Sequence, residues 1–389
     1  MKKLIRTATV SLSLDILLKG QLQFLSQNFD VVAISGQDEH LIEVEKREKV
    51  KTIAVTFERK IAPFNDLVSL FKLYRVFKKE KPFIVHSITP KAGLLSMIAG
   101  YFAKVPIRIH TFTGLVFPTR TGLMQQLLIV MDKVLCLFAT HIYPEGNGVK
   151  KDLIDYKITK KALKIIANGN INGIDCDYFN TNHFSETTKQ SLKAALKVDP
   201  NDFVFIFVGR LVKDKGINEL ITAFVRFSET NKQVKLLLVG PFEQHLNPIN
   251  DSTLQKIKEN STIISVGYQN DVRPYYAISN CLVFPSYREG FPNVVLQAGA
   301  MNLPCIVTNI NGSNEIITNN ENGLIIEIKN ENAIFEALNV MIIEKQLYEK
   351  LKNNARKKIV TNFEQKIVWE AVLDEYKKIE NYYQNLKSS

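Results

Sequence analysis

The sequence predicts an α/β protein that consists of two doubly wound domains facing each other across a cleft. Short runs of β-branched and aromatic residues alternate with amphipathic stretches, which is typical of repeated βαβ units and parallel sheets. The loop-forming stretch ANGNINGIDCDYFN, residues 167–180, interrupts this alternation, and the same alternation then starts again. We therefore expect two successive sheets, with a hinge just beyond this loop.

The first domain is expected over residues 1–180. Its amino-terminal segment resembles a signal peptide, but Arg6 and Asp15 interrupt the apolar run, which favours a buried strand followed by a helix. Helices are expected between the strands. The predicted strands of this domain lie at 4–10, 31–35, 52–55, 83–86, 107–111, 141–143 and 163–166.

The second domain is expected over residues 181–362, and a carboxy-terminal helix over 363–389 is expected to cross back and pack across the domains. Apolar and aromatic side chains at helical spacing form a stripe along this helix, namely Trp369, Val372, Leu373 and Tyr376. In such folds, ligands bind outside the carboxyl ends of the strands. The predicted strands of the second domain lie at 203–208, 235–239, 262–266, 281–284, 305–307 and 323–328.

Basic residues are concentrated in the first half of the chain. Residues 1–180 contain 26 Lys and Arg against 16 Asp and Glu, whereas residues 181–389 contain 24 against 23. This excess favours an anionic membrane surface or a phosphate-bearing acceptor, and its alternative is a solvated basic face. Since the sequence has no zinc-ligand spacing, RNP motif or dense basic helix, we expect no nucleic-acid partner.

The compartment of the protein is predicted from the length of its apolar runs and the spacing of its cysteines. No window reaches 18 uninterrupted apolar residues, and the four cysteines are scattered without CxxC spacing. We therefore expect reduced thiols and a cytoplasmic protein.

The stretch FVFIFVGRLVKDKG, residues 203–216, is a predicted strand that leads into a glycine-containing basic loop. Gly209 lets the backbone approach a ligand closely, and Arg210 and Lys215 can hold a diphosphate from two sides. A helix that begins near Ile217 would add free backbone N–H groups and the positive end of its dipole. The alternative is a basic surface turn.

The stretch VFPSYREGFPNVVLQAGA, residues 283–300, repeats this arrangement. We expect Glu289 to open a helix that has Pro292 in its first turn, so that Gln297 lies two turns further on the same face. Glu289 could accept hydrogen bonds from hydroxyl groups, and the N–H groups after Gly290 could hold phosphate or sugar oxygens. Alternatively, Glu289 complements the helix dipole.

Two stretches of the first half contain further candidate residues. In IRIHTFTG, residues 107–114, His110 ends a strand; a lone His there is more often structural, but this one would point into the cleft if the two sheets face each other. In HSITPKAG, residues 86–93, a helix is expected with Thr89 as its N-cap and Pro90 at the first position, and Lys91 would make a second anion site. The alternative for this stretch is an ordinary cap with a solvated lysine.

Asp175 and Asp177 form a DxD sequence, a pattern of carboxylates that chelates a metal ion in some enzymes. They lie in the expected hinge loop, and no cluster of further ligands has metal-binding spacing. We therefore expect no metal site.

Taken together, these stretches resemble glycosyltransferase family 4, the retaining transferases of the GT-B architecture with two Rossmann-like domains. In the second half the resemblance rests on NGNINGIDCDYF, GRLVKDKG, VGYQNDVRPYY and VFPSYREGFPNVVLQA. In the first half SLSLDILLKGQLQFL, HSITPKAG and RIHTFTGLVF are similar to the bacterial branch that builds capsule, O-antigen or glycan precursors on a polyprenyl diphosphate carrier.

The resemblance implies a role for each matching residue. Arg210 and Lys215 would bind the donor diphosphate close to the backbone of Gly209, and Glu289 would face the donor sugar. His110 would lie beside the reacting sugar. The other implied contacts are Gly290, Phe291 and Pro292 at sugar and phosphate, Gln297 at the ribose, Tyr268 at the nucleobase, and Lys91, Thr113 and Gly114 at the acceptor.

The chain departs from the family pattern at two positions. The amino-terminal glycine pair is not evident, because Gly20 falls within the first expected helical region. Gln297 stands where a second acid is expected. A Gln can still bond two ribose hydroxyls, but it loses charge assistance, which weakens donor binding by about 1 to 2 kcal/mol.

Together with the charge distribution, this resemblance implies a retaining glycosyltransferase with no cofactor or metal, peripheral on the inner face of the cytoplasmic membrane. It would move a sugar from a UDP-hexose or UDP-N-acetylhexosamine to a lipid-linked saccharide, the leaving phosphate helping to take the acceptor proton. Two alternatives remain: a UDP-sugar 2-epimerase of the same architecture, and a non-catalytic partner that only binds the donor.

Overall fold

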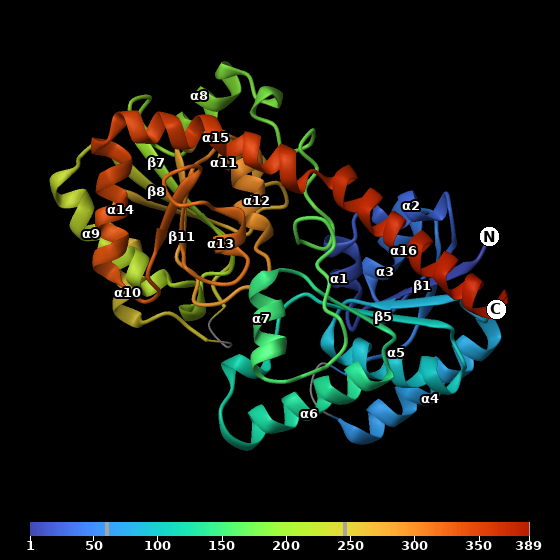
Figure 1. Ribbon diagram of the computed structural model, residues 1–389. Helices are drawn as coiled ribbons and strands as arrows, with labels where there is room; N and C mark the ends of the chain where they lie inside the picture. The colour runs from blue at the N-terminus through green and yellow to red at the C-terminus, as the bar shows by residue number, and fades with distance from the viewer. Residues whose placement is uncertain (59–61, 244–246, 389) are drawn as a thin grey trace. The chain divides into compact units, whose positions relative to one another are not determined.

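The computed structural model describes all residues except 59–61, 244–246 and 389. The chain forms two compact units, one made of Met1–Gly173 with Gln365–Ser389 and the other of Ile174–Glu364 (Figure 1). Each unit contains a six-stranded, entirely parallel sheet. The predicted α/β class with two doubly wound sheets is confirmed.

The sheet of the first unit has the order β3-β2-β1-β4-β5-β6. The order reverses between β1 and β4, and this switch point is where doubly wound sheets bind ligands. Most residues of these strands are buried, as expected where both faces of a parallel sheet are covered, and β3 at the edge is only partly buried. Their bounds are β1 Lys3–Thr7, β2 Asp30–Ser35, β3 Lys51–Ala54, β4 Ile84–Ser87, β5 Ile107–Phe112 and β6 His141–Pro144.

Helices cover both faces of this sheet. One core joins it to α1 (Ser11–Leu17), α2 (Gln21–Ser26), α3 (Glu39–Glu48) and the carboxy-terminal helix α16 (Gln365–Ser388). A second core joins the other face to α4 (Pro63–Glu80), α5 (Pro90–Phe102) and α6 (Gly122–Phe138), and includes residues of α7 (Asn147–Asp155). A short turn, η1 (Phe117–Thr119), precedes α6.

The sheet of the second unit has the order β12-β11-β10-β7-β8-β9, and its switch point lies between β7 and β10. One core cluster runs through this unit. The strands are β7 Phe203–Val208, β8 Val234–Val239, β9 Ile263–Gly267, β10 Cys281–Phe284, β11 Cys305–Thr308 and β12 Gly323–Ile326. The helices are η2 Thr181–His183, α8 Glu186–Ala195, η3 Lys213–Lys215, α9 Ile217–Thr230, α10 Asp251–Glu259, α11 Arg273–Ala277, α12 Asn293–Ala300, α13 Ser313–Ile316, α14 Glu331–Ile343 and α15 Lys345–Phe363.

The predicted strand at 163–166 is wrong. Leu163 makes only an isolated bridge to Ile142, and the segment is otherwise irregular. Its apolar residues pack instead of pairing, Leu163 on one core of the first unit and Ile166 on the other.

Gly20 lies between α1 and α2, not inside one helix. Its φ is +80°, and an added Cβ would come within 2.6 Å of the Trp369 ring. Its N–H donates to Glu48 Oε1 at 2.8 Å. Gly20 therefore serves a turn that packs under α16.

Among the described residues, no helix is both long and apolar enough to cross a membrane. All four cysteines are buried free thiols.

Candidate functional site

The predicted site of the second unit lies at its switch point, where β7 and β10 end. Gly209 follows β7 with φ +147°, and Gly240 follows the neighbouring strand β8. A Cβ on Gly240 would lie 1.9 Å from the carbonyl oxygen of Gly209. Backbone therefore packs directly on backbone here, which only glycine permits.

Lys215 and Glu289 meet at this edge of the sheet. Lys215 ends η3, and its Nζ forms an ion pair with Glu289 Oε1 in the loop after β10. The same carboxylate oxygen accepts a hydrogen bond of 2.7 Å from Ser286 Oγ. Lys215 Nζ also lies 5.1 Å from the ring centre of Phe284. The two residues predicted to contact diphosphate and sugar are thus direct neighbours.

Several contacts hold the two loops together. The N–H of Tyr287 donates to the carbonyl of Asp214 at 2.9 Å, and its hydroxyl donates to Glu219 Oε1 at 2.6 Å. Gly216, with φ +72°, has the carbonyl oxygen of Pro285 only 2.1 Å from the position of an added Cβ. These contacts join the two loops of the site to each other.

The predicted opening of a helix at Glu289 is wrong. The helix α12 begins at Asn293, with Pro292 as its N-cap, so Glu289 lies four residues earlier in the loop. Glu289 and Gln297 therefore do not share a helix face. Gln297 lies in α12, where its Oε1 accepts a 3.4 Å hydrogen bond from the hydroxyl of Tyr276.

The start of α9 agrees with the sequence prediction. This helix begins at Ile217 directly after the left-handed Gly216, so its first N–H groups follow Lys215. Asn218 in this first turn is buried, and its side-chain oxygen accepts from the N–H of Asn250 at 3.0 Å.

The segment from Gly290 to Pro292 packs closely on a neighbouring loop. A Cβ on Gly312 would lie 2.3 Å from the carbonyl oxygen of Gly290 and 2.8 Å from Pro292. Phe291 is buried, with its ring centre 5.5 Å from that of Phe363. These contacts fix the backbone that is predicted to meet sugar and phosphate.

Arg210 and Tyr268 follow two strands of the same sheet, β7 and β9, which are separated by β8. Arg210 comes two residues after β7, and its Nη1 donates to Glu243 Oε2 at 2.7 Å. Tyr268 directly follows β9 and is 70% exposed. Their roles in donor binding stay predictions, as do those of Lys215, Glu289 and Gln297.

In the first unit, His110 is buried inside the fold. Its Nδ1 lies 2.8 Å from Ser87 Oγ, and a Cβ on Gly93 would come within 2.5 Å of the ring. Burial lowers the pKa of His110 to about 3, so the imidazole is neutral at pH 7. These surroundings match the structural alternative, and a catalytic role remains a prediction.

The predicted acceptor residues have partners within the fold. Lys91 Nζ pairs with Asp66, 2.7 Å from its Oδ1, and Thr113 Oγ1 donates to the carbonyl of Ile88 at 2.9 Å. Gly114 has φ +135°. Thr89 is the N-cap of α5 and Pro90 its first residue, as predicted, but the Thr89 hydroxyl accepts from the N–H of Thr9 instead of capping the helix.

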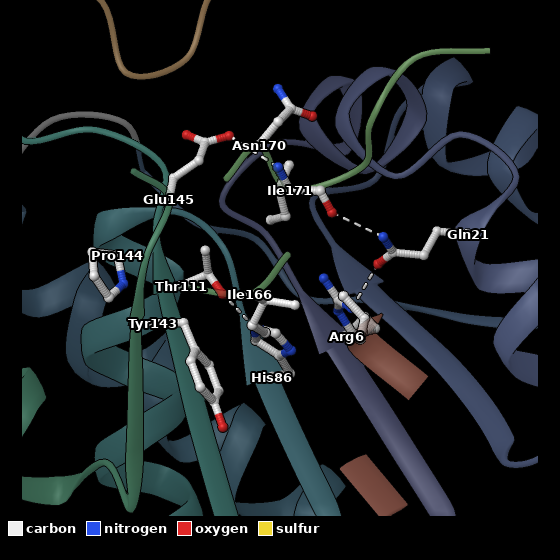
Figure 2. A pocket seen from close by; sticks show the side chains of 11 residues that line it. Arg6, Gln21, His86, Thr111, Tyr143, Pro144, Glu145, Ile166, Asn170 and Ile171 are labelled. Atoms are coloured by element: carbon white, nitrogen blue, oxygen red, sulfur yellow. Dashed lines mark hydrogen bonds between the residues drawn. The ribbon is translucent and has the colours of Figure 1, made fainter. Parts of the chain in front are cut away.

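Sequence reasoning missed a buried polar cluster at the switch point of the first unit, where Arg6 of β1 lies opposite His86 of β4 (Figure 2). The fully buried Arg6 donates from Nη1 to Gln21 Oε1 and to the Tyr376 hydroxyl, each at 2.9 Å. His86 lies between Tyr376 Oη at 2.5 Å and Thr111 Oγ1 at 2.8 Å. Burial and the charge of Arg6 hold the pKa of His86 well below its usual value.

The cluster borders a cavity of about 20 Å³, which is room for a water molecule but not for a sugar. The loop around Ile171 closes one side, where Glu145 Oε1 accepts from the N–H of Ile171 at 3.2 Å and Gln21 Nε2 donates to the carbonyl of Ile171 at 2.9 Å. One signal was available in the sequence, because a lone Arg in a buried strand requires polar partners.

The DxD sequence has a local structural role. Asp175 Oδ1 accepts hydrogen bonds from the N–H groups of Asp177, at 3.1 Å, and Tyr178, at 2.8 Å. Within the described part of the chain, no group of three or more His, Cys, Asp or Glu residues is placed to hold a metal ion.

Known proteins match the chain over almost its whole length. The family described as glycosyl transferases group 1 matches residues 188–358, and the family described as glycosyl transferase 4-like matches residues 13–145. The capsular polysaccharide biosynthesis glycosyltransferase CapM of Staphylococcus aureus is 34% identical over 377 residues, which cover 96% of this chain and 97% of that protein.

A second relative and a solved structure extend these matches. The Escherichia coli UDP-Gal:alpha-D-GlcNAc-diphosphoundecaprenol alpha-1,3-galactosyltransferase is 29% identical over 310 residues, 79% of this chain and 78% of that protein. The crystal structure of Anabaena Alr3699/HepE in complex with UDP and glucose has a TM-score of 0.82 at 17% identity, and the match covers 97% of this chain and all of that one. The latter match supports the fold alone.

Proposed function

We propose a donor, an acceptor and a set of donor contacts for this chain, which belongs to the glycosyl transferases of group 1. The chain is a glycosyltransferase. In our proposal it transfers a hexosyl or N-acetylhexosaminyl group, with retention, from a UDP-sugar to a saccharide linked to polyprenyl diphosphate.

The names of the relatives support this donor and acceptor. The E. coli relative is named for transfer from UDP-Gal to a GlcNAc-diphosphoundecaprenol, and the S. aureus relative for capsular polysaccharide biosynthesis. A Campylobacter jejuni relative, 28% identical over 220 residues, is named for an acceptor on the same kind of carrier. The names of the E. coli and C. jejuni relatives thus both specify a lipid-linked acceptor.

The ion pair of Lys215 and Glu289 carries the proposal for the donor site. Lys215 offers positive charge where the first N–H groups of α9 begin, and Arg210, which pairs with Glu243, would add a second cation. An incoming diphosphate would draw Lys215 away from Glu289, and the freed carboxylate would then accept hydrogen bonds from the donor sugar. Binding of the donor thus exchanges one set of contacts for another at a fixed site.

These groups suit transfer in which the diphosphate leaves from the face that the acceptor attacks. The bond from the anomeric carbon to the phosphate oxygen breaks, the acceptor oxygen bonds to that carbon, and the acceptor proton passes to the departing phosphate. Lys215, Arg210 and the N–H groups of α9 would stabilise the charge that develops on UDP. The proposal assigns no step to a metal ion.

We also propose that the protein works at the inner face of the cytoplasmic membrane as a peripheral protein. A lipid-linked acceptor stays in the bilayer, and the first 180 residues carry a net charge of +10 by the count given above. Anionic headgroups attract such a charge at moderate salt.

Donor binding and transfer test the proposed function. A thermal-shift panel of nucleotides and nucleotide sugars should show stabilisation by UDP and one UDP-sugar, because a ligand of the folded state raises its melting temperature. The selected UDP-sugar and a short-chain saccharide diphosphate acceptor should then yield UDP and an extended saccharide. Stabilisation by a nucleotide other than UDP would contradict the proposed donor.

The two alternatives predict other results. An epimerase would isomerise a UDP-sugar without acceptor, which nuclear magnetic resonance of the sugar would detect. A protein that only binds the donor would shift its melting temperature with UDP but form no product with any acceptor of this class.

A further inference from the structure

The helix α4 exposes an apolar stripe on its outer side. Phe64, Leu67, Val68 and Phe71 follow helical spacing, all four are exposed, and Phe64 is 88% exposed. The opposite side of α4, with Leu73 and Phe77, packs on the core. Single exposed apolar residues are ordinary, but a continuous stripe indicates an interaction surface.

The neighbouring helices extend this stripe into a surface. On α6, Leu123, Leu127, Val130 and Leu137 recur at intervals of four, three and seven residues, and Leu123 is 90% exposed. In the first unit α4 packs on α5 and α5 on α6, as Figure 1 shows at its lower edge. We call the outer side of these three helices the α4–α6 face.

A groove deepens this face between α4 and α5. It has a volume of about 190 Å³ and an almost wholly apolar lining, contributed by Leu67, Leu70, Phe71, Tyr74, Ala99 and Phe102. Its width is set by side chains of two helices that belong to one core, so it does not depend on the second unit.

Positive charge accompanies the apolar residues. Residues 63–138, which span the three helices, contain ten Lys and Arg but only three Asp and Glu. Lys72, Arg75 and Lys79 are exposed on α4 itself. Two of the three acids are in ion pairs, Asp66 with Lys91 and Glu80 with Lys3. The basic residues of this face therefore outnumber the nearby acids, and two of these acids are already in ion pairs.

We propose that the α4–α6 face docks on an anionic lipid bilayer, with its apolar side chains among the acyl chains and its cations at the headgroups. This proposal depends on the proposed function in one respect: a lipid-linked acceptor is the reason why the protein would work at a membrane. The positive charge of the face favours a bilayer over a second copy of the chain. A symmetric contact between two copies would bring the same cations together, whereas anionic headgroups complement them. The groove would take part of one lipid chain.

Vesicle binding by the full chain tests this proposal. Phosphatidylcholine vesicles with roughly 30% phosphatidylglycerol should bind the protein at least about tenfold more tightly than phosphatidylcholine alone. Replacing Phe64→Gln, Leu67→Gln and Phe71→Gln together should weaken binding to the anionic vesicles about tenfold or more, because these side chains no longer leave water. The pair Lys72→Gln and Arg75→Gln should reduce binding at low salt and have less effect at high salt.

The matched control is the pair Ile154→Gln and Ile343→Gln, which alters exposed apolar residues on α7 and α14. It should bind vesicles as the unaltered protein does. Thermal melting with and without UDP keeps the outcome separate from donor binding, since every variant should gain the same stabilisation from UDP.

Three results would overturn the proposal. The unaltered protein could fail to bind anionic vesicles; the triple variant could bind them as tightly as the control does; or the triple variant could convert a dimer to a monomer in analytical ultracentrifugation, which would make the face a contact between copies. None of these results would change transfer to a short-chain acceptor in solution, so the proposed reaction stands or fails separately.

Discussion

Lys215 and Glu289 lie 74 residues apart in the chain and form an ion pair between the loops that follow β7 and β10. Both side chains are largely buried, and Ser286 holds the same carboxylate oxygen. The positive charge predicted for the donor diphosphate is therefore neutralised by a group predicted for the donor sugar. A ligand that takes over the lysine would release the glutamate at the same moment.

The ion pair predicts that replacing Lys215 and replacing Glu289 have different effects on UDP binding. Lys215→Met should weaken UDP binding by about ten- to a hundredfold, the loss of one charge-assisted contact to phosphate. Glu289→Gln should leave UDP binding unchanged or make it tighter, because the carboxylate that competes for Lys215 is gone, while transfer of sugar falls. Calorimetric titration with UDP and a transfer assay measure the two effects.

Lys213→Met is the matched control for Lys215→Met. Lys213 belongs to the same turn, η3, and is exposed. UDP binding should change by less than about threefold, as expected for a distant surface charge. If the two substitutions weakened UDP binding equally, UDP binding would depend only on the total charge of this turn and not on a specific contact with Lys215.

Gly216 predicts a test of the loop packing. Gly216→Ala should lower the free energy of unfolding by about 2 kcal/mol or more, since φ is +72° and the new Cβ meets the carbonyl oxygen of Pro285. Gly267→Ala is the control, because its φ of +67° is similar and its added Cβ meets no atom within 4 Å. The difference between the two melting temperatures measures the close contact. Equal melting temperatures would show that the loop after β10 shifts freely.

The strands of the second unit could be predicted because burial on both faces leaves nearly continuous apolar runs, such as FVFIFV in β7 and CLVF in β10. The predicted strand at 163–166 failed because packing produces the same pattern without pairing. Lys161 next to it donates to the carbonyl of Cys136 at 2.7 Å, so this part of the segment is held at the end of α6. An apolar run alone does not distinguish a strand that pairs in a sheet from an irregular segment that packs on the core.

The candidate site was predicted as a set of residue types but not as a set of contacts. Pro292 was expected in the first turn of α12 and is its N-cap, which moves Glu289 into the loop and towards Lys215. The pairing of Lys91 with Asp66 likewise joins α5 to α4. Contacts between distant elements depend on tertiary packing, and no local pattern specifies them.

Replacing Gln297 by Glu is expected to increase the affinity for UDP. Gln297→Glu should tighten UDP binding about tenfold, since a carboxylate forms charge-assisted hydrogen bonds with ribose hydroxyls. The hydroxyl of Tyr276, 3.4 Å from Gln297 Oε1, can donate to either side chain, so the fold should tolerate the change. Gln255→Glu, exposed on α10, is the control. Weaker binding of UDP by Gln297→Glu than by this control would exclude the ribose role.

Asp132 on α6 predicts a pH-dependent stability. Burial raises the pKa of its carboxyl to about 7, so between pH 4 and 7 the folded state keeps a proton that the unfolded state has lost. The resulting penalty is absent below about pH 4, grows up to pH 7 and stays constant above it. Because the side chain is only half-buried, we expect Asp132→Asn to stabilise the protein by about 1 to 2 kcal/mol at pH 8.

Urea unfolding at about pH 4.5 and pH 8 measures this difference, which should be severalfold smaller at the lower pH. A constant gain at both values would indicate a packing effect of the amide instead of titration.

The cluster of Arg6, His86 and Tyr376 predicts how strongly α16 is held on the first sheet. Tyr376→Phe removes the hydroxyl that accepts from Arg6 Nη1 and bonds His86 Nδ1, and it leaves buried polar groups without a partner. We expect the free energy of unfolding to fall by about 2 to 3 kcal/mol. Tyr382→Phe, on an exposed side of the same helix, should change it by less than about 0.5 kcal/mol. If both variants melt at the same temperature, packing of the Tyr376 ring, not its hydroxyl, holds α16 in place.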